Sequence, residues 1–297
     1  MERVLKINKL TKKFGRLCAV NELELEVMKG QVFGILGPNG SGKTTTLGML
    51  MGVILPTSGD YSWMGEPPTH TIRRKIGAVL EHPIFYPYLS GQKNLELMAI
   101  IKQAPVENIP KVLDLVGLTD RKEDKYKNYS LGMKQRLAIA TALVNDPIVL
   151  ILDEPTNGLD PMGIAQIRDI IKKIALSGKT IILASHLLDE VEKICTHFAI
   201  LMKGNKVYDG AMGDISRSEE VVTITAPQEN VGTYFEKFKG TISVQKDDHN
   251  YLVKLKPGFS SDELNRFLVE NGVFVSQLST KKKSLEKQFL EILAENK

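Results

Sequence analysis

The stretch QVFGILGPNGSGKTTTLGML, residues 31–50, joins an apolar run to a glycine-rich turn and a second apolar segment. The run at 31–37 predicts a buried strand, and the segment after the turn predicts a helix. GPNGSGKT, at 37–44, fits the pattern G-x-x-x-x-G-K-[ST], which requires a strand before it and a helix after it. Both are expected here, so the stretch predicts a phosphate-binding loop rather than a chance match in a glycine-rich turn.

The residue types of this loop suit a nucleoside triphosphate. Glycines let backbone N–H groups face the β-phosphate, and the helix N-terminus adds a partial positive charge. We expect Lys43 to place its charge at the β- and γ-phosphates and the Thr44 hydroxyl to ligate Mg²⁺. The residues expected to contact the nucleotide are Gly37, Pro38, Asn39, Gly40, Ser41, Gly42, Lys43, Thr44 and Thr45.

A second apolar run, PIVLILDE at 147–154, ends in two acids. Its composition predicts a strand buried on both faces, which places Asp153 at the carboxyl edge of a sheet, where ligands bind. We expect Asp153 to hold Mg²⁺ and Glu154 to polarise the attacking water as the general base. The alternative is a solvated acidic helix start, which five preceding apolar residues disfavour.

The surrounding pattern predicts the fold class. KTIILASH at 179–186 is a further apolar strand, and helical stretches precede it and 147–154, which favours a parallel α/β sheet. LKINKLTKKF at 5–14 and NELELEVMKG at 21–30 alternate with a period of two, as in an antiparallel layer with one wet face. The region from 90 to 147 contains three helix-like stretches and no convincing strand, so we expect a helical insert.

The character of the chain changes after KGNKVYDG, 203–210, which reads as a hairpin. Strand-like and helix-like stretches then follow in the order β-α-β-β-α-β, with the last strand expected at VFVSQLS, 273–279. This order suggests a ferredoxin-like domain before a last helix at 284–296. We therefore expect an α/β P-loop NTPase domain over 1–215, with its helical insert at about 84–147. An α+β accessory domain is expected over 216–297.

The bulk composition narrows the class of function. The chain of 297 residues has a formal net charge of +4, too small by itself to indicate a nucleic-acid partner. Cys18 and Cys195 lack metal-ligand spacing and suit a reducing cytoplasm. The start lacks the apolar core of a signal peptide, and the longest uncharged run, 44–59, is too short and broken to span a bilayer. A role at a membrane would therefore require recruitment.

The stretch YSLGMKQRLAIA, 129–140, is similar to the signature motif of the ATP-binding-cassette (ABC) ATPases. On this stretch the chain resembles that family. A hydroxyl and a glycine at a helix start form a second anion-binding end. In that family this end contacts the γ-phosphate held by the opposite subunit. The resemblance therefore implies a homodimer, or pairing with a second cassette, in the ATP state. The residues it assigns to this contact are Ser130, Leu131, Gly132 and Met133.

Other positions acquire roles through the same resemblance. TNGLD is similar to the family's D-loop, with Asp160 as its aspartate. His186 matches the switch histidine, which orients the catalytic carboxylate and contacts the γ-phosphate. Phe14 matches the aromatic residue that stacks on adenine, and Val20 is expected to pack against the same base. Taken alone, His186 would be read as a structural residue and Phe14 as core.

The resemblance covers about residues 3–215 and extends to a branch of the family. LGMKQRL, EHPIFYPYLSGQKNLEL and SLEKQFLEIL are similar to stretches of bacitracin- and lantibiotic-type exporters. This implies ATP and Mg²⁺ as cofactors and a separate transmembrane permease. It also implies a cytoplasmic protein, peripheral on the inner face of the cell membrane, with no nucleic-acid partner.

Glu81 departs from the family pattern. IGAVLEHP, 76–83, places it where most members have the Q-loop glutamine, which touches Mg²⁺ and the nucleophilic water. We expect Glu81 to approach Mg²⁺ in the ATP state, with a solvated strand end as the alternative. No second histidine or acid lies at ligand spacing from His82, so His82 is not expected to bind metal.

Alternative functions within the family remain open at this stage. An import ATPase often carries a β-barrel at its C-terminal end, whereas 216–297 reads as α+β. A soluble ABC protein acting on ribosomes or DNA usually fuses two cassettes or contains a long coiled coil. A non-hydrolysing regulatory cassette is disfavoured by Glu154 and His186. The C-terminal region could assist pairing, regulate hydrolysis, dock a partner or only stabilise the chain.

Overall fold

The computed structural model describes residues 2–80, 84–213, 221–226, 231–247, 250–256 and 258–281. The chain forms two compact units, Met1–Gly210 and Ala211–Lys297. The predicted metal-proximal Glu81, its neighbour His82 and the expected last helix at 284–296 lie outside the described residues.

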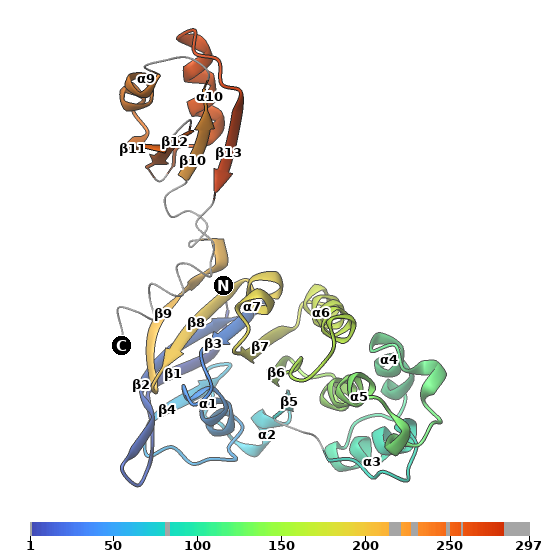
Figure 1. Ribbon diagram of the computed structural model, residues 1–297. Coiled ribbons are helices and arrows are strands. Elements are labelled where there is room, and N and C mark those ends of the chain that lie inside the picture. Colours follow the sequence, from blue (N-terminus) through green and yellow to red (C-terminus); the bar gives the residue numbers. More distant parts are fainter. Residues whose placement is uncertain are drawn as a thin grey trace. The chain divides into compact units, whose positions relative to one another are not determined.

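The first unit is built on a six-stranded sheet with the strand order β5-β6-β7-β3-β8-β9 (Figure 1). The first five of these strands run parallel. Every residue of β3, β6 and β7 is buried, because both faces of the sheet are covered. This confirms the predicted α/β class. The strands are β3 (Val32–Leu36), β5 (Ile76–Val79), β6 (Val149–Asp153), β7 (Thr180–Ser185), β8 (His197–Met202) and β9 (Asn205–Ala211).

A second, antiparallel sheet has the order β2-β1-β4, with β1 at Arg3–Phe14, β2 at Leu17–Met28 and β4 at Ser58–Trp63. Alternate residues of β2 are buried, so the predicted layer with one wet face is confirmed. Helix α1 (Lys43–Leu50) contributes Leu47 and Leu50 to one apolar core with residues of both sheets. This packing holds the phosphate-binding loop, at the start of α1, against the parallel sheet.

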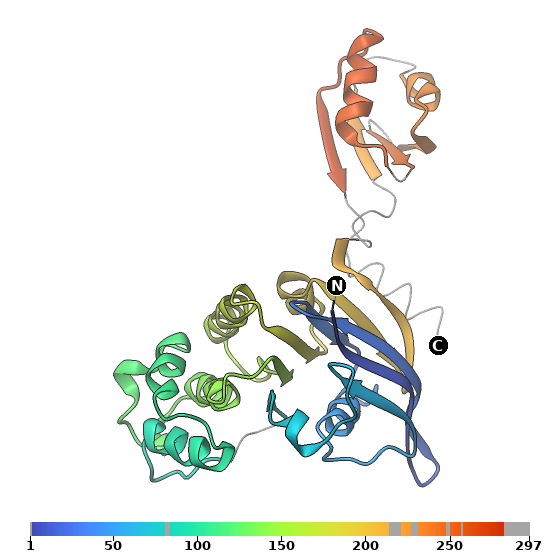
Figure 2. The same ribbon diagram turned by 180° about the vertical axis from the view of Figure 1, so that it is seen from behind.

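The helical insert forms one side of this unit, as the two opposite views show (Figures 1 and 2). Its described residues contain helices and one isolated bridge, between Ser90 and Lys125. Each of the three expected helix-like stretches forms a helix. The elements of the insert are α3 (Gly91–Lys102), α4 (Asn108–Leu115), η1 (Thr119–Arg121), η2 (Tyr126–Asn128) and α5 (Leu131–Leu143). The other helices of the unit are α2 (His70–Arg73), α6 (Pro161–Leu176) and α7 (Leu188–Ile194).

The second unit has the predicted order of elements and an antiparallel sheet ordered β11-β12-β10-β13. The prediction placed its last strand at 273–279, but β13 begins only at Gln277. The reason is that the Val273 N–H donates to the Leu268 carbonyl (2.9 Å) and ends the helix, so it cannot join a strand ladder. The elements are β10 (Val221–Thr225), α9 (Gly232–Lys237), β11 (Thr241–Asp247), β12 (Asn250–Leu255), α10 (Ser261–Glu270) and β13 (Gln277–Lys281).

Candidate nucleotide-binding site

The start of α1 is left open for an anion. Its N-cap, Gly42, has φ 104° and makes no side-chain cap, so no hydroxyl occupies the first amides of the helix. A Cβ at Gly42 would lie 2.4 Å from the Ala19 carbonyl oxygen, so only glycine fits this close approach. The predicted phosphate-binding loop therefore combines uncapped helix amides with a close backbone approach that only glycine allows.

A cavity of about 420 Å³ lies beside this loop. Phe14, 49% exposed, stands at the end of β1 and pairs with Leu17 across the β1–β2 turn. The Lys12 ammonium lies 4.9 Å from the centre of the Phe14 ring. The cavity therefore combines an accessible aromatic surface with a phosphate-binding loop. It is lined by Phe14, Leu17, Cys18, Ala19, Asn39, Gly40, Gly42, Lys43, Thr44, Thr45, Glu154 and Lys203.

Lys43 is the buried cation of the cavity, with only 5% of its side chain exposed. Its ammonium donates to the carbonyl oxygens of Gly37 at 2.8 Å and Pro38 at 3.3 Å. It also lies 3.3 Å from Glu154 Oε1. The loop carbonyls therefore hold the charge of Lys43 inside the phosphate-binding loop, next to the predicted general base.

The predicted catalytic pair forms where β6 and β7 end. These strands are parallel neighbours, so their carboxyl ends meet at one edge of the sheet. Glu154 Oε2 accepts from the His186 N–H at 3.3 Å and lies 2.8 Å from His186 Nδ1. Glu154 also has φ 46°, a left-handed conformation that is strained for a residue with a Cβ. Its carboxylate thus lies between a lysine and a histidine.

The residues predicted for Mg²⁺ have the right chemistry for that ion. The exposed Thr44 carries a hydroxyl on the cavity wall, and Asp153 ends β6 with only 3% exposure. Among the described residues no three histidines, cysteines or acids gather as a ready-made metal site. Hydroxyl and carboxylate oxygens are ligands that suit Mg²⁺, which usually takes one or two protein oxygens together with substrate phosphates.

The signature residues lie at the start of α5 and do not line the cavity of their own chain. Ser130 is the N-cap, and its hydroxyl accepts from the Met133 N–H at 3.2 Å. Leu131 is 48% exposed, and a Cβ on Gly132 would meet open space. The helix start is therefore accessible from outside.

Asp160 and Val20, which were also predicted as site residues, make contacts outside the cavity. Asp160 caps α6 by accepting from the Gly163 N–H at 2.8 Å. The side chain of Val20 is fully buried in the core, and its Cγ2 would lie 3.3 Å from a Cβ on Gly42. Neither side chain lies on the cavity wall.

Four residues of the cavity wall were not predicted from the sequence: Leu17, Cys18, Ala19 and Lys203. The turn at Lys203 and Gly204 is tied to the phosphate-binding loop, because the Gly204 N–H donates to the Ser41 carbonyl at 3.1 Å. The hairpin at 203–210 was predictable, but its contact with a loop some 160 positions earlier had no local pattern. The buried, hydrogen-bonded pair of Thr156 and Glu190 was also not predicted.

The site and the fold together define an ATP-binding cassette, and comparison with known proteins agrees. The family described as ABC transporter matches residues 20–157. The uncharacterized ABC transporter ATP-binding protein YhcH of Bacillus subtilis is 39% identical, over 100% of this chain and 98% of the relative. The bacitracin transport ATP-binding protein BcrA of Enterococcus faecalis is 33% identical over 99% and 97%. The lantibiotic transport ATP-binding protein SrtF of Streptococcus pyogenes is 39% identical over 70% and 93%.

Solved structures are also similar. The cbiO1 protein of Clostridium perfringens, part of an ABC transporter complex, superimposes with a TM-score of 0.67 at 29% identity, over 72% of this chain and 91% of that one. A dimeric post-hydrolysis structure of the cassette MJ0796 with ADP and phosphate gives 0.64 at 27% identity, over 70% and 98%. The chain belongs to the ABC transporter ATP-binding proteins: it is the ATP-binding subunit of an ABC transporter, and an ATPase.

Proposed function

We propose that this subunit powers export of a peptide antibiotic or a similar compound, with Glu154 as general base. The observation that carries the catalytic assignment is the placement of Glu154 between Lys43 and His186 beside the cavity. Support for the transport branch comes from relatives named for bacitracin and lantibiotic transport.

The predicted site residues then divide the tasks of hydrolysis among them. Phe14 stacks on the base, while Lys43 and the loop amides hold the phosphates. Thr44 and Asp153 hold Mg²⁺, which when bound neutralises charge on the phosphates. Glu154 takes a proton from the attacking water, and His186 keeps its carboxylate in place. Positioning and charge stabilisation supply most of the catalysis.

Pairing of two copies would complete each site. The exposed N-terminus of α5, with Ser130 and Gly132, contacts nothing in the cavity of its own chain and is free to meet the γ-phosphate of a second copy. The related cassette MJ0796 is described as dimeric with ADP and phosphate. In this arrangement Asp160 lies near the junction between the two copies.

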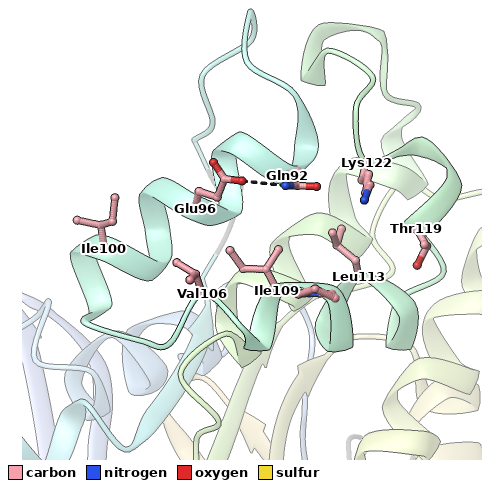
Figure 3. Close-up of a pocket in the computed structure, with 9 residues that line it drawn as sticks. Gln92, Glu96, Ile100, Val106, Ile109, Leu113, Thr119 and Lys122 are labelled. Carbon is pink, nitrogen blue, oxygen red and sulfur yellow. Dashed lines mark hydrogen bonds between the residues drawn. The ribbon is translucent and has the colours of Figure 1, made fainter.

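The helical insert carries a groove of about 490 Å³, which we assign to a cytoplasmic segment of a separate permease. Figure 3 shows side chains of α3 and α4 facing each other across it. Ile100 and Val106 are 69% and 50% exposed, and at the far end Gln92 donates to Glu96 at 2.9 Å. The groove is lined by Gln92, Glu96, Ile100, Val106, Ile109, Pro110, Leu113, Thr119 and Lys122.

A partner in the membrane is needed because transport requires a path across the bilayer. None of the helices among the described residues is long and apolar enough to form a membrane span. The cbiO1 protein, whose fold is similar, is described as part of a transporter complex. The subunit would then act on the cytoplasmic face of the membrane, bound through its helical insert.

The second unit suits a ferredoxin-like assignment. In its sheet, β12 lies between β10 and β11, and β10 lies between β12 and β13. Each β-α-β segment is therefore split by a strand of the other, as in the ferredoxin-like arrangement. The domain boundary near residue 215 and the insert limits of 84–147 belong to the same proposal.

Glu154→Gln tests the catalytic assignment. The amide has the size of the carboxylate but cannot accept the proton of water, so we expect the ATPase rate to fall by about 100-fold or more while ATP binding is retained. The variant should also accumulate as an ATP-bound dimer in size-exclusion chromatography with Mg-ATP. A full hydrolysis rate would overturn the role of Glu154, and a monomer at saturating Mg-ATP would overturn the pairing.

A further inference from the structure

Glu190, in the first turn of α7, is a buried acid that the mechanism above does not use. Only 2% of the residue is exposed. Its Oε2 accepts a hydrogen bond from the Thr156 hydroxyl at 2.5 Å, and Thr156 is itself 2% exposed. Oε1 of Glu190 has no hydrogen-bond partner among the described residues. A buried carboxylate with one free oxygen is costly, so it needs an explanation beyond packing.

The position of this pair relates it to the catalytic loops. Thr156 follows Glu154 by two positions, in the connection between β6 and α6, and Glu190 follows His186 by four. The segments that follow β6 and β7 are therefore joined twice, once by Glu154 and His186 and once by Thr156 and Glu190, the latter in α7. A backbone bond from the Glu154 N–H to the Ala184 carbonyl, at 2.9 Å, adds a third link.

Groups around the buried Glu190 shift its pKa in both directions. Burial raises the pKa of Glu190, while the Thr156 hydroxyl and the Arg168 guanidinium lower it, and Glu154 and Asp189 raise it further. Arg168, on α6, lies 3.5 Å from Asp189. Glu190 and Glu154 therefore affect each other electrostatically, which places the buried pair within the field of the catalytic centre.

The backbone of Glu154 shows why a second link is needed. A left-handed φ in a residue with a Cβ persists only where its surroundings hold it. We propose that Glu190 and Thr156 are positioning residues, whose hydrogen bond holds the loop after β6 so that the Glu154 carboxylate stays opposite His186. This inference rests on the proposed roles of Glu154 and His186.

Four variants of the full chain test the proposal through the ATPase rate and the KM for ATP. Thr156→Val removes the hydroxyl at nearly constant shape, and we expect kcat to fall by about tenfold or more with KM changed less than about twofold. Thr156→Ser keeps the donor and Glu190→Gln keeps an acceptor, so both should retain most of kcat.

The fourth variant separates positioning from stability. Thr156→Val/Glu190→Met replaces both polar partners by apolar groups, which leaves no unpaired buried carboxylate and is expected to fold even where Thr156→Val does not. Its thermal midpoint should stay near that of the wild type while kcat stays low. Wild-type kcat in the folded double variant would overturn the proposal, and so would equal losses in the Val and Ser variants.

Glu154→Gln measured in parallel distinguishes this inference from the proposed function. If Glu154→Gln is inactive and Thr156→Val is fully active, the positioning role fails and the general base stands. If Glu154→Gln hydrolyses ATP at the wild-type rate, the proposed function fails, and the positioning role fails with it.

Discussion

The parallel-sheet edge and the helical insert of the first unit differ in what their polar side chains contact. At the sheet edge, Glu154 contacts both Lys43, at the start of α1, and His186, which follows β7. In the insert, the Lys102 ammonium donates to the Thr141 carbonyl at 2.7 Å, and the Asn108 amide donates to the Val144 carbonyl at 2.9 Å. Both side chains therefore donate hydrogen bonds to backbone carbonyls at the end of α5.

The difference indicates where each region binds its partners. The groove of the insert exposes the apolar side chains of Ile100 and Val106, beside the hydrogen-bonded Gln92 and Glu96 (Figure 3). Polar groups of the sheet edge bind each other across loops and line a cavity, where a charged ligand can replace those contacts. A nucleotide therefore suits the sheet edge, and an apolar protein segment suits the groove of the insert.

Lys43→Ala should have the largest effect, because it removes the buried cation of the sheet edge. We expect affinity for ATP to fall on the order of 100-fold, since a hydrogen bond between charged groups contributes up to about 3 kcal/mol. Titration calorimetry with ATP measures this. Lys203→Ala is the matched control, because Lys203 is an exposed lysine on the wall of the same cavity and should cost less. Equal losses would remove the distinction between the two lysines.

Ile100→Glu should have an intermediate effect, confined to partner binding. It places a charge in the apolar groove without disturbing the core, since Ile100 is 69% exposed. We expect about a tenfold loss of the integral membrane protein retained by the tagged chain from native membranes, quantified by mass spectrometry. Leu176→Glu, at an 88% exposed position of α6 outside the groove, is the control. Undiminished retention by Ile100→Glu would contradict the assignment of the groove.

Lys102→Met should have the smallest effect, visible as a pH dependence of stability. Burial lowers the pKa of Lys102 to about 8, so between that pH and its unfolded value near 10.4 the unfolded chain binds more protons. The free energy of unfolding of the wild type should therefore rise relative to the variant as pH increases through this window. Urea denaturation at pH 7 and pH 10 measures the difference, with Lys172→Met at an exposed site of α6 as control. A constant difference would contradict the buried charge.

Much of the site could be predicted because its motifs are local. The loop from Gly37 to Thr44 is recognisable from its glycines and flanking apolar runs, and Glu154 from the buried strand before it. The limits of β13 were wrong because Val273 belongs to a helix cap, although its residue type also suits a strand. Short apolar stretches are ambiguous until their hydrogen-bond partners are known.

The sequence by itself determined the class of the protein, the phosphate-binding loop, and the presence of an acid, Glu154, after a buried strand. It could do so because each of these depends on residues close together in the chain. Only the tertiary structure decided that Lys203 borders the cavity, that the signature residues do not, and that Thr156 bonds Glu190. Such contacts depend on strand order and on how loops from different strands meet, and no local spacing contains that information.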